Sequence, residues 1–183
     1  MGNLAMDGVV RLSRVLSFPS NSLILLCGAP GCGKSTFARR HFAPTEIVSS
    51  DDCRRRVCDN VYNMKVHRET FSLVRHIARL RMSLGRLTVI DATALRRGMR
   101  RSMMRLAGDY GFRTGVIVLD VRLSTCLSRN KSRKRKVSED VIRSFYILLH
   151  KAKTDVYKEG FDRIYVLGEE DVDQAIVTIN RGS

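Results

Sequence analysis

Residues 28–36 read GAPGCGKST, and this stretch decides the fold. It matches the phosphate-binding loop pattern G-x-x-x-x-G-K-[ST] at every fixed position. The apolar run from Leu23 to Cys27 precedes it, and the segment from Phe37 to Phe42 reads as the first turns of a helix. The sequence therefore predicts the strand, glycine-rich loop and helix in which this motif binds phosphate.

The residue types of this phosphate loop suit a nucleoside triphosphate. Glycines let the backbone turn so that successive N–H groups point into one concavity, and the start of a helix adds its positive dipole end. We expect Lys34 to contact the outer phosphates of ATP and Ser35 to contribute a hydroxyl to Mg²⁺. The predicted nucleotide-binding residues are Gly28, Ala29, Pro30, Gly31, Cys32, Gly33, Lys34, Ser35 and Thr36.

The composition indicates one globular domain with a strongly basic surface. The chain has 183 residues, of which 44% are hydrophobic, and this is enough for one well-buried core. Thirty-three Lys and Arg against eighteen Asp and Glu give a net charge of +15. Such an excess favours a polyanionic partner, most simply nucleic acid, and a merely solvated surface is the alternative.

The sequence gives no sign of a membrane or secretory protein. No apolar run approaches membrane-spanning length, and residues 1–20 lack a signal-peptide core. The five cysteines are odd in number, which fits reduced thiols. We therefore expect a cytoplasmic protein without a membrane partner.

Strand-type and helix-type segments alternate along the chain. This order predicts an α/β fold of the P-loop NTPase type, with a parallel sheet of about five strands flanked by helices and a basic lid. We expect residues 1–20 to be an N-terminal extension and residues 21–183 to be one P-loop kinase domain. The predicted strands are 23–27, 46–49, 87–91, 114–120 and 163–167, and the last predicted helix is 171–179.

Acidic residues follow two of the predicted strands, at the edge where open parallel sheets bind ligands. Asp51 comes just after the strand 46–49, where its carboxylate can accept a proton from an attacking hydroxyl; helix capping is the alternative. Asp91 ends the strand 87–91. We expect Asp91 to help hold Mg²⁺ together with Ser35, and a structural hydrogen bond is the alternative.

A run of basic residues from Arg129 to Lys136 holds six Lys or Arg in eight positions. It lies between the helix after the fourth strand and the long helix before the fifth. This position predicts a lid whose guanidinium groups neutralise charge on a transferred phosphoryl group. A solvated charge run or a nuclear-targeting signal would have the same composition.

A second basic cluster follows the third strand. With the arginines at 54–56 it is a candidate groove for a nucleic acid backbone, and an exposed basic helix without a ligand is the alternative. His67 and His76 on the preceding predicted helix are interpreted as structural. The cluster consists of Arg96, Arg97, Arg100, Arg101 and Arg105.

Beyond the phosphate loop, four segments resemble the kinase domain of bacterial polynucleotide kinase-phosphatase, an RNA end-healing protein. They read GAPGCGKSTFARRHFAPTEIVSSDDCR at 28–54, LGRLTVIDAT at 84–93, CLSRNKSR at 126–133 and EGFDRIYVL at 159–167. The resemblance covers roughly residues 22–168. Its most discriminating part is the combination SSD-x-CR after the second strand.

The resemblance implies transfer of the γ-phosphate of ATP to the 5′-hydroxyl end of RNA or DNA. It implies that Asp51 is the general base and that Arg54 orients the acceptor and its neighbouring phosphate. It also implies that Lys34 and Ser35 serve the nucleotide phosphates and Mg²⁺. The expected small ligands are therefore ATP and Mg²⁺, and the expected partner is a 5′-hydroxyl polynucleotide.

By the same resemblance, the lid cations would be Arg133 and Arg135. The lid is one residue shorter than the family pattern, so Lys136 is the alternative to Arg135 at the second position. Two further departures are Ala94, where Asn is usual, and the segment 58–65, which replaces an acidic loop. The bacterial relatives also carry phosphatase and ligase modules. Separate phosphatase and ligase repair proteins are therefore expected partners.

Two other hypotheses stay open on the sequence. A kinase for a small-molecule hydroxyl acceptor explains the phosphate loop and the lid equally well, but it does not need a charge of +15. A nucleic-acid-binding module that uses ATP only as a structural ligand or switch explains the charge, but not the general base and lid.

Overall fold

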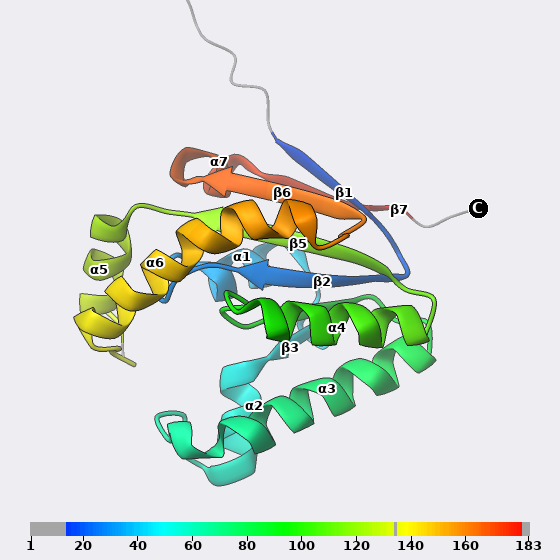
Figure 1. The fold of residues 1–183 in the computed structure, drawn as a ribbon, viewed down its shortest axis with the longest axis horizontal. Helices are drawn as coiled ribbons and strands as arrows, with labels where there is room; N and C mark the ends of the chain where they lie inside the picture. The colour runs from blue at the N-terminus through cyan, green and yellow to red at the C-terminus, as the bar shows by residue number, and fades with distance from the viewer. Residues whose placement is uncertain (1–13, 134, 181–183) are drawn as a thin grey trace, which may run out of the picture.

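The computed structural model describes residues 14–133 and 135–180. Its centre is a parallel sheet of five strands in the order β3-β4-β2-β5-β6 (Figure 1). The predicted α/β fold with about five parallel strands is confirmed. The strands are β2 (Ser22–Cys27), β3 (Ile47–Ser49), β4 (Thr88–Asp91), β5 (Arg113–Asp120) and β6 (Arg163–Gly168).

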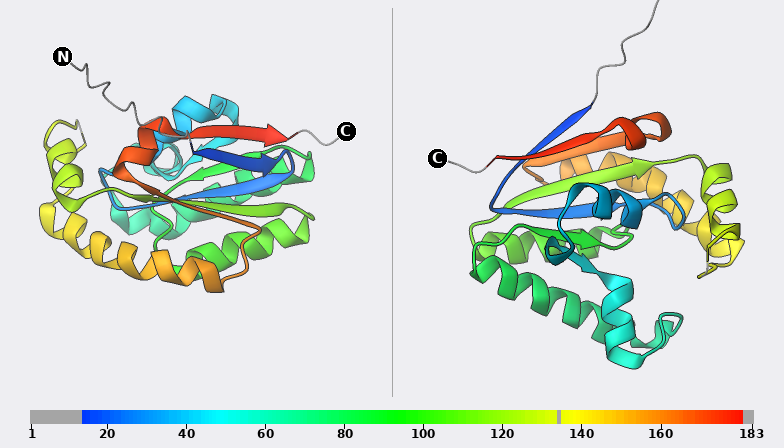
Figure 2. Two further views of the ribbon diagram at one scale, coloured as in Figure 1. Left: turned by 90° about the horizontal axis from the view of Figure 1, so that it is seen from above. Right: turned by 180° about the vertical axis from the view of Figure 1, so that it is seen from behind.

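Helices cover both faces of this sheet, as Figures 1 and 2 show. The central strand β2 is buried along its whole length, because its alternate side chains enter two different hydrophobic clusters. One cluster includes α3 (His67–Ser83), α4 (Arg97–Asp109) and α6 (Glu139–Asp155). The other includes α1 (Lys34–His41), α5 (Leu123–Lys131) and α7 (Glu169–Gln174).

Shorter elements connect these layers. The helix α2 (Ser50–Cys58) follows β3 directly and packs against α3. Single 3-10 turns precede β3, α3 and β6, namely η1 (Pro44–Glu46), η2 (Met64–Val66) and η3 (Val156–Lys158).

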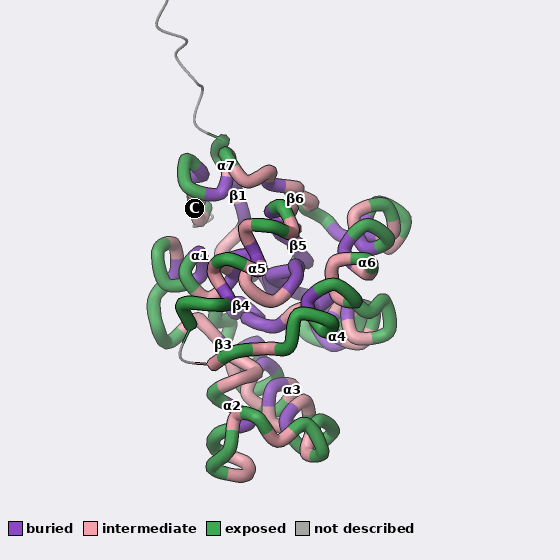
Figure 3. Tube along the Cα trace, turned by 90° about the vertical axis from the view of Figure 1, so that its left-hand side faces the viewer, coloured by how far each residue is buried: buried purple, intermediate pink, exposed green. Residues whose placement is uncertain are grey.

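Burial follows the layering. The inner strands β2, β4 and β5 are largely buried and the edge strands β3 and β6 are partly buried, whereas the helices expose one side and bury the other (Figure 3). Within the described residues, no helix combines the length and the apolar composition that a bilayer-spanning segment requires.

The predicted helix 171–179 is wrong in its second half. The helix α7 ends at Gln174, Ala175 is extended, and the strand β7 (Ile176–Asn180) follows. Residues 176–179 are three β-branched aliphatic residues and a threonine, and alternate side chains are exposed, which is the period of a strand. Tertiary pairing thus overrides the helical interpretation of this segment.

The strand β7 pairs in parallel with β1 (Val15–Pro19), and the two form a small second sheet. Leu16 and Phe18 of β1 are fully buried in the same cluster as α1. The strand β1 lies in the segment predicted as an N-terminal extension, of which residues 1–13 lie outside the described residues, as do residues 181–183 of the predicted domain.

The register of the sheet brings the predicted site residues to one edge. Leu26 of β2 and Ser49 of β3 both lie opposite Asp91 of β4. The carboxyl ends of these three strands therefore meet, and the phosphate loop, the start of α2 and the end of β4 follow from the same edge.

Candidate active site

The phosphate loop is a tight backbone turn at this edge. Gly31 and Gly33 have φ values of 88° and 100°, in the left-handed region. A Cβ atom at Gly31 would lie 2.4 Å from the carbonyl oxygen of Cys126, so the backbone of α5 packs against the loop. The amide of Gly28 donates to the carbonyl oxygen of Thr93 at 3.1 Å, which ties the loop to the segment after β4. The loop is therefore held by backbone contacts.

Lys34 folds back onto this loop. Its ammonium donates hydrogen bonds to the carbonyl oxygens of Gly28 at 2.9 Å and Ala29 at 2.8 Å. The side chain is buried, yet it lines the cavity described below. It also lies 3.5 Å from the Cys32 sulfur. A cation whose partners are neutral groups suits phosphate oxygens, which bind an ammonium more strongly.

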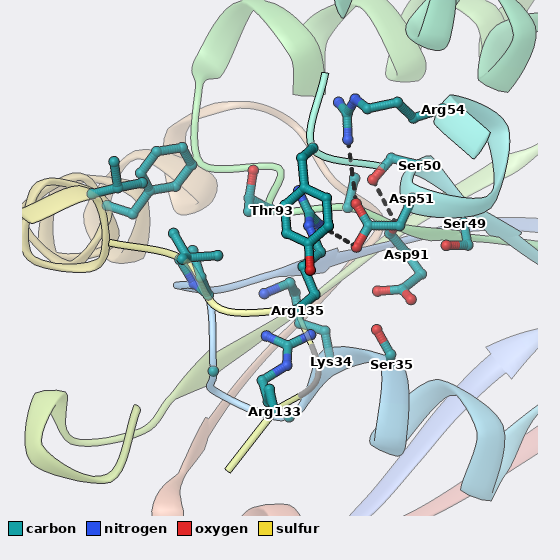
Figure 4. A pocket seen from close by; sticks show the side chains of 18 of the residues that line it. Lys34, Ser35, Ser49, Ser50, Asp51, Arg54, Asp91, Thr93, Arg133 and Arg135 are labelled. Carbon is teal, nitrogen blue, oxygen red and sulfur yellow. Dashed lines mark hydrogen bonds and ion pairs between the residues drawn. The ribbon is translucent and has the colours of Figure 1, made fainter. Parts of the chain in front are cut away.

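Ser35 and Asp91 form a hydroxyl–carboxylate pair beside the loop (Figure 4). The Ser35 hydroxyl donates a hydrogen bond to the Asp91 carboxylate, and the Ser50 hydroxyl donates to the Asp91 carbonyl oxygen at 3.2 Å. Burial raises the pKa of Asp91, and the hydrogen bond from Ser35 and the charge of Lys34 partly oppose this. Hydroxyl and carboxylate oxygens are the hard ligands that Mg²⁺ prefers, so this donor set fits Mg²⁺.

Asp51 lies between two arginines across the cavity from the loop (Figure 4). Arg54 Nη1 lies 3.3 Å from Asp51 Oδ1, and Arg135 Nη1 forms an ion pair with Asp51 Oδ2. The helix α2 is capped by the Ser49 hydroxyl, which accepts from the backbone amide of Asp52 at 3.3 Å. Ser49, and not Asp51, therefore caps this helix. The Asp51 carboxylate points into the site instead.

Both arginines beside Asp51 have spare hydrogen-bonding capacity. The side chain of Arg54 is 4% exposed and that of Arg135 is 24% exposed. Within the part of the chain that the structure describes, the Nε atom of each is buried and has no hydrogen-bond partner. Buried guanidinium groups with unmet donors suit an anionic oxygen.

The basic run lies at the mouth of this site. Arg133, Arg135 and Lys136 all line the cavity, and Arg135 additionally packs over the Tyr62 ring, with its Cζ 5.8 Å from the ring centroid. Lys134, which belongs to the same run, lies outside the described residues. Of the two competing residues, it is Arg135 that pairs with Asp51.

One cavity of about 740 Å³ brings most of the predicted residues together. Gly28, Ala29 and Cys32 do not line it, and Ala29 and Cys32 are fully buried. The predicted residues that line the cavity are Pro30, Gly31, Gly33, Lys34, Ser35, Thr36, Asp51, Arg54, Asp91, Arg133 and Arg135.

Sequence reasoning missed the apolar wall of this cavity. Tyr62 and Met64 belong to the segment 58–65, which was noted only as a departure from the family pattern, and His67 was interpreted as structural. All three line the cavity together with Phe71. The rings of His67 and Phe71 lie 4.6 Å apart. The i, i+4 spacing of these two residues was visible in the sequence, but the helix face that it marks could be placed only by tertiary packing.

Arg129 was also missed as an individual site residue. Its Nη1 donates to the carbonyl oxygen of Cys32 at 3.4 Å, and it lines the cavity near Gly33. It stands at the start of the predicted basic run, whose composition was the available signal.

The interpretation of Arg100 as part of a nucleic acid groove is wrong. Its side chain is fully buried and bonds to both carboxylate oxygens of Glu159, at 2.7 and 2.5 Å. It also donates to the carbonyl oxygens of Ala94 at 2.9 Å and Leu95 at 2.8 Å. Arg100 therefore anchors the segment after β4, and a buried ion pair needs this full set of partners.

A five-stranded parallel sheet, a phosphate loop and a basic segment facing it define a nucleotide-binding domain with the P-loop kinase fold. The sequence matches the family model described as AAA domain over residues 23–146, and the chain belongs to this family.

Known proteins of several kinds are similar to this chain. Transcription factor bHLH140 of Arabidopsis thaliana is 30% identical over 167 residues, which are 87% of this chain and 17% of that protein. A chain of the Pnkp1/Rnl/Hen1 RNA repair complex is similar with a TM-score of 0.64 and 23% identity, over 76% of this chain and 47% of that one. The APS kinase CysC of Mycobacterium tuberculosis, solved with AMPPNP and APS, is similar with a TM-score of 0.53 and 17% identity. The match covers 85% of this chain and 95% of that one.

The similarity of fold to a chain of the RNA repair complex agrees with the predicted resemblance to the kinase domain of polynucleotide kinase-phosphatase. The similar proteins also include a kinase for a small molecule, and the chain spans less than half of the first two relatives. The fold and the nucleotide-binding class are therefore established, and the acceptor is a separate question.

Proposed function

We propose that this domain is an ATP-dependent 5′-hydroxyl polynucleotide kinase that acts on RNA or DNA ends in nucleic acid end healing. One observation carries the proposal: the Asp51 carboxylate, paired with Arg54 and Arg135, faces the phosphate loop across one cavity. Phosphoryl transfer to a hydroxyl requires a base, an anion-binding arginine and a triphosphate site, and this cavity holds candidates for all three.

On the donor side, the backbone amides of the phosphate loop bind the phosphates of ATP, and Lys34 contacts the outer ones. Ser35 and Asp91 would hold Mg²⁺, which would neutralise charge on the phosphates. Both roles are supported by the geometry of the loop and by the hydroxyl–carboxylate pair.

On the acceptor side, Asp51 accepts the proton of the attacking hydroxyl. The hydroxyl oxygen forms a bond to the γ-phosphorus as the bond between this phosphorus and the β,γ-bridging oxygen breaks, and ADP leaves. Arg54 binds the neighbouring phosphate of the acceptor, and its unmet Nε donor supports this role. Arg133 and Arg135 neutralise charge that develops on the transferred group.

A small hydroxyl compound is a second candidate acceptor. The apolar wall that includes Tyr62, Met64 and Phe71 faces the phosphate loop across the same cavity, and a domain of similar fold and length is an APS kinase. The net charge of +15 favours the polynucleotide, because a small acceptor has no use for an extended cationic surface.

The direct test is incubation with labelled ATP and 5′-hydroxyl RNA and DNA oligonucleotides. We expect label at the 5′ end, and we expect Asp51→Asn to lower the rate by about 10²–10⁴-fold. Asp52→Asn is the matched control, because Asp52 is the next carboxylate of α2, is exposed and pairs with Arg55. The absence of label on every oligonucleotide, with transfer to a small hydroxyl compound, would replace this proposal by the second one.

The partners of such a kinase follow from its product. A 5′-phosphate is a substrate for ligation, so separate phosphatase and ligase proteins are the proposed repair partners. The similarity to a chain of an RNA repair complex supports this.

A further inference from the structure

Helices α3 and α4, with the segments that flank them, carry most of the net positive charge of the chain. Residues 65–105 contain eleven Lys or Arg and only two acidic residues, Glu69 and Asp91. Asp91 belongs to the cavity, so the surface of this segment is almost free of negative charge. The segment supplies more than half of the net charge of the chain.

Three arginines form a row along the exposed side of α4. Arg97, Arg101 and Arg105 recur every four residues, which places them on one helix face, and all three are exposed. Within residues 14–133 and 135–180, no carboxylate pairs with Arg101 or Arg105, and Arg97 has only a 3.7 Å contact to Glu159. We call these residues the α4 arginine row.

Exposed arginines on other elements are different. Several are neutralised by a neighbouring carboxylate: Arg14 pairs with Asp171, Arg40 with Asp173 and Arg122 with Glu169. Among the described residues, the α4 arginine row has no anionic partner beyond the contact of Arg97 with Glu159, so solvent ions or an anionic ligand would relieve the repulsion among its members.

The α4 arginine row begins near the cavity. Thr93 lines the cavity, and Arg96, the N-cap residue of α4, follows it by only three residues, so Arg96 lies close to the site. In agreement with this, burial and the charges of Arg54 and Arg96 lower the pKa of His67, which also lines the cavity. Arg96 directly precedes the row. From this end, α4 runs away from the carboxyl end of β4, with α3 on its outer side (Figure 1). Arg75 Nη1 of α3 joins the two helices by donating to the Ser102 carbonyl oxygen at 3.2 Å.

The length of the row suits a polymer. With a rise of about 1.5 Å per residue, Arg97 and Arg105 lie about 12 Å apart along α4. This exceeds the rise of about 3.4 Å between successive phosphates of one duplex strand, so the row spans several phosphate positions. A single small anion would occupy only one of the three guanidinium groups.

We propose that the α4 arginine row binds the sugar-phosphate backbone of the acceptor strand, on the 3′ side of its terminal nucleotide. The strand leaves the cavity past Arg54 and Arg96 and continues along α4. Guanidinium groups contact phosphates without reading bases, so this surface gives affinity and not sequence preference. The proposal rests on the proposed function, and it adds the path of the strand.

The test is the variant Arg97→Gln/Arg101→Gln/Arg105→Gln. We expect its Kd for a 3′-labelled, 5′-hydroxyl 12-mer, measured by fluorescence anisotropy, to rise about tenfold or more at 0.1 M salt. The slope of log K against log salt should decrease in magnitude by about 2, because each single-strand phosphate contact contributes about 0.7. In the kinase assay, KM for the 12-mer rises, whereas kcat and the KM for a 5′-hydroxyl dinucleotide stay the same.

The matched control is Arg14→Gln/Arg40→Gln/Arg163→Gln, which removes the same charge from exposed sites just before β1, on α1 and on β6. We expect it to bind the 12-mer almost as the unmodified protein does. An equal loss in both variants, or no loss in the α4 variant, would overturn the proposal. Failure of the proposed function is a different outcome: no oligonucleotide is then phosphorylated by the unmodified protein, and the binding measurement still decides the role of the row.

Discussion

The two halves of the candidate active site are built in different ways. The phosphate loop is a local stretch held by backbone contacts, such as the 2.4 Å approach of a Gly31 Cβ position to the Cys126 carbonyl oxygen. The acceptor half is built from side chains of distant segments, which meet in the ion pairs of Asp51 with Arg54 and Arg135. Asp51 is 37% exposed.

This difference indicates that the phosphate loop is rigid, whereas the arginines of the acceptor half can exchange Asp51 for a bound phosphate. A backbone loop packed on the core cannot rearrange without disturbing the sheet. An ion pair at a half-exposed carboxylate is weak, so phosphates in the cavity compete for Arg135. We therefore expect changes in the loop to affect nucleotide binding and stability, and changes in the acceptor half to affect transfer more selectively.

Of the two cationic side chains Lys34 and Arg135, one from each half of the site, Lys34 is expected to matter more for activity when it is replaced, in Lys34→Met. The substitution keeps the buried stem but removes the ammonium that we propose contacts the phosphates, so the rate of phosphoryl transfer falls by about 10³-fold. ATP affinity, measured by titration calorimetry, falls as well, whereas the melting temperature changes little. Retention of more than a tenth of the activity would contradict a donor role for Lys34.

A second pair of substitutions isolates the backbone packing of the loop. Gly31→Ala and Gly33→Ala both place a side chain at positive φ, which costs about 1–3 kcal/mol. Only at position 31 does the new Cβ meet a backbone oxygen; at position 33 the nearest atom is Arg129 Nη1 at 3.5 Å. We expect Gly31→Ala to lower the free energy of unfolding about 1–3 kcal/mol more than Gly33→Ala, by urea denaturation.

Equal losses for these two variants would mean that α5 moves away from the loop at little cost. The loop would then be less rigid than its contacts indicate, and the contrast between the two halves of the site would be weaker.

In the acceptor half, Arg135→Gln is expected to have a smaller and more selective effect. It removes one ion pair of Asp51 and one proposed lid cation, so kcat decreases by about 10–100-fold. ATP affinity decreases less than in Lys34→Met, because the loop itself is unchanged. Nucleotide affinity and single-turnover rates measured on both variants provide the comparison, and an equal loss of ATP affinity would contradict the division into two halves.

The sequence predicted the first half of the site better than the second, for a physical reason. The loop motif and the strand-end position of Asp91 are local, so spacing alone located them. Arg100 was misassigned because an arginine on a basic helix face has no local mark that it pairs with Glu159, 59 residues away. The strand β7 was missed because its pairing with β1 joins the two ends of the chain.

The apolar wall was missed for the same reason. Tyr62 and Met64 lie in a segment that has loop composition, and only the packing of α2 and α3 directs them to the cavity. Residues whose role depends on a neighbour far along the chain leave no pattern in a single sequence.

The smallest expected effect is a change in the pKa of His67. It tests whether Arg96, at the start of α4, lies close to the acceptor half of the site. Burial, then the charges of Arg54 and Arg96, lower the pKa of His67 from 6.5. As the pH falls, His67 is therefore protonated in the unfolded chain before it is protonated in the folded protein. The free energy of unfolding decreases between pH 6.5 and the lower pKa of the folded state, and this contribution is constant below that pKa. Arg96→Gln removes one repelling charge, so the pKa should rise while the part due to burial persists.

An NMR titration of the histidine ring protons measures this change in the unmodified protein and in Arg96→Gln. His41 is the internal control, because burial and Arg40 lower its pKa and Arg96 has no part in it. We expect the His67 pKa to rise in the variant and the His41 pKa to stay the same. If neither value moves, Arg96 does not lie at the mouth of the cavity, and the α4 arginine row loses its connection to the proposed acceptor site.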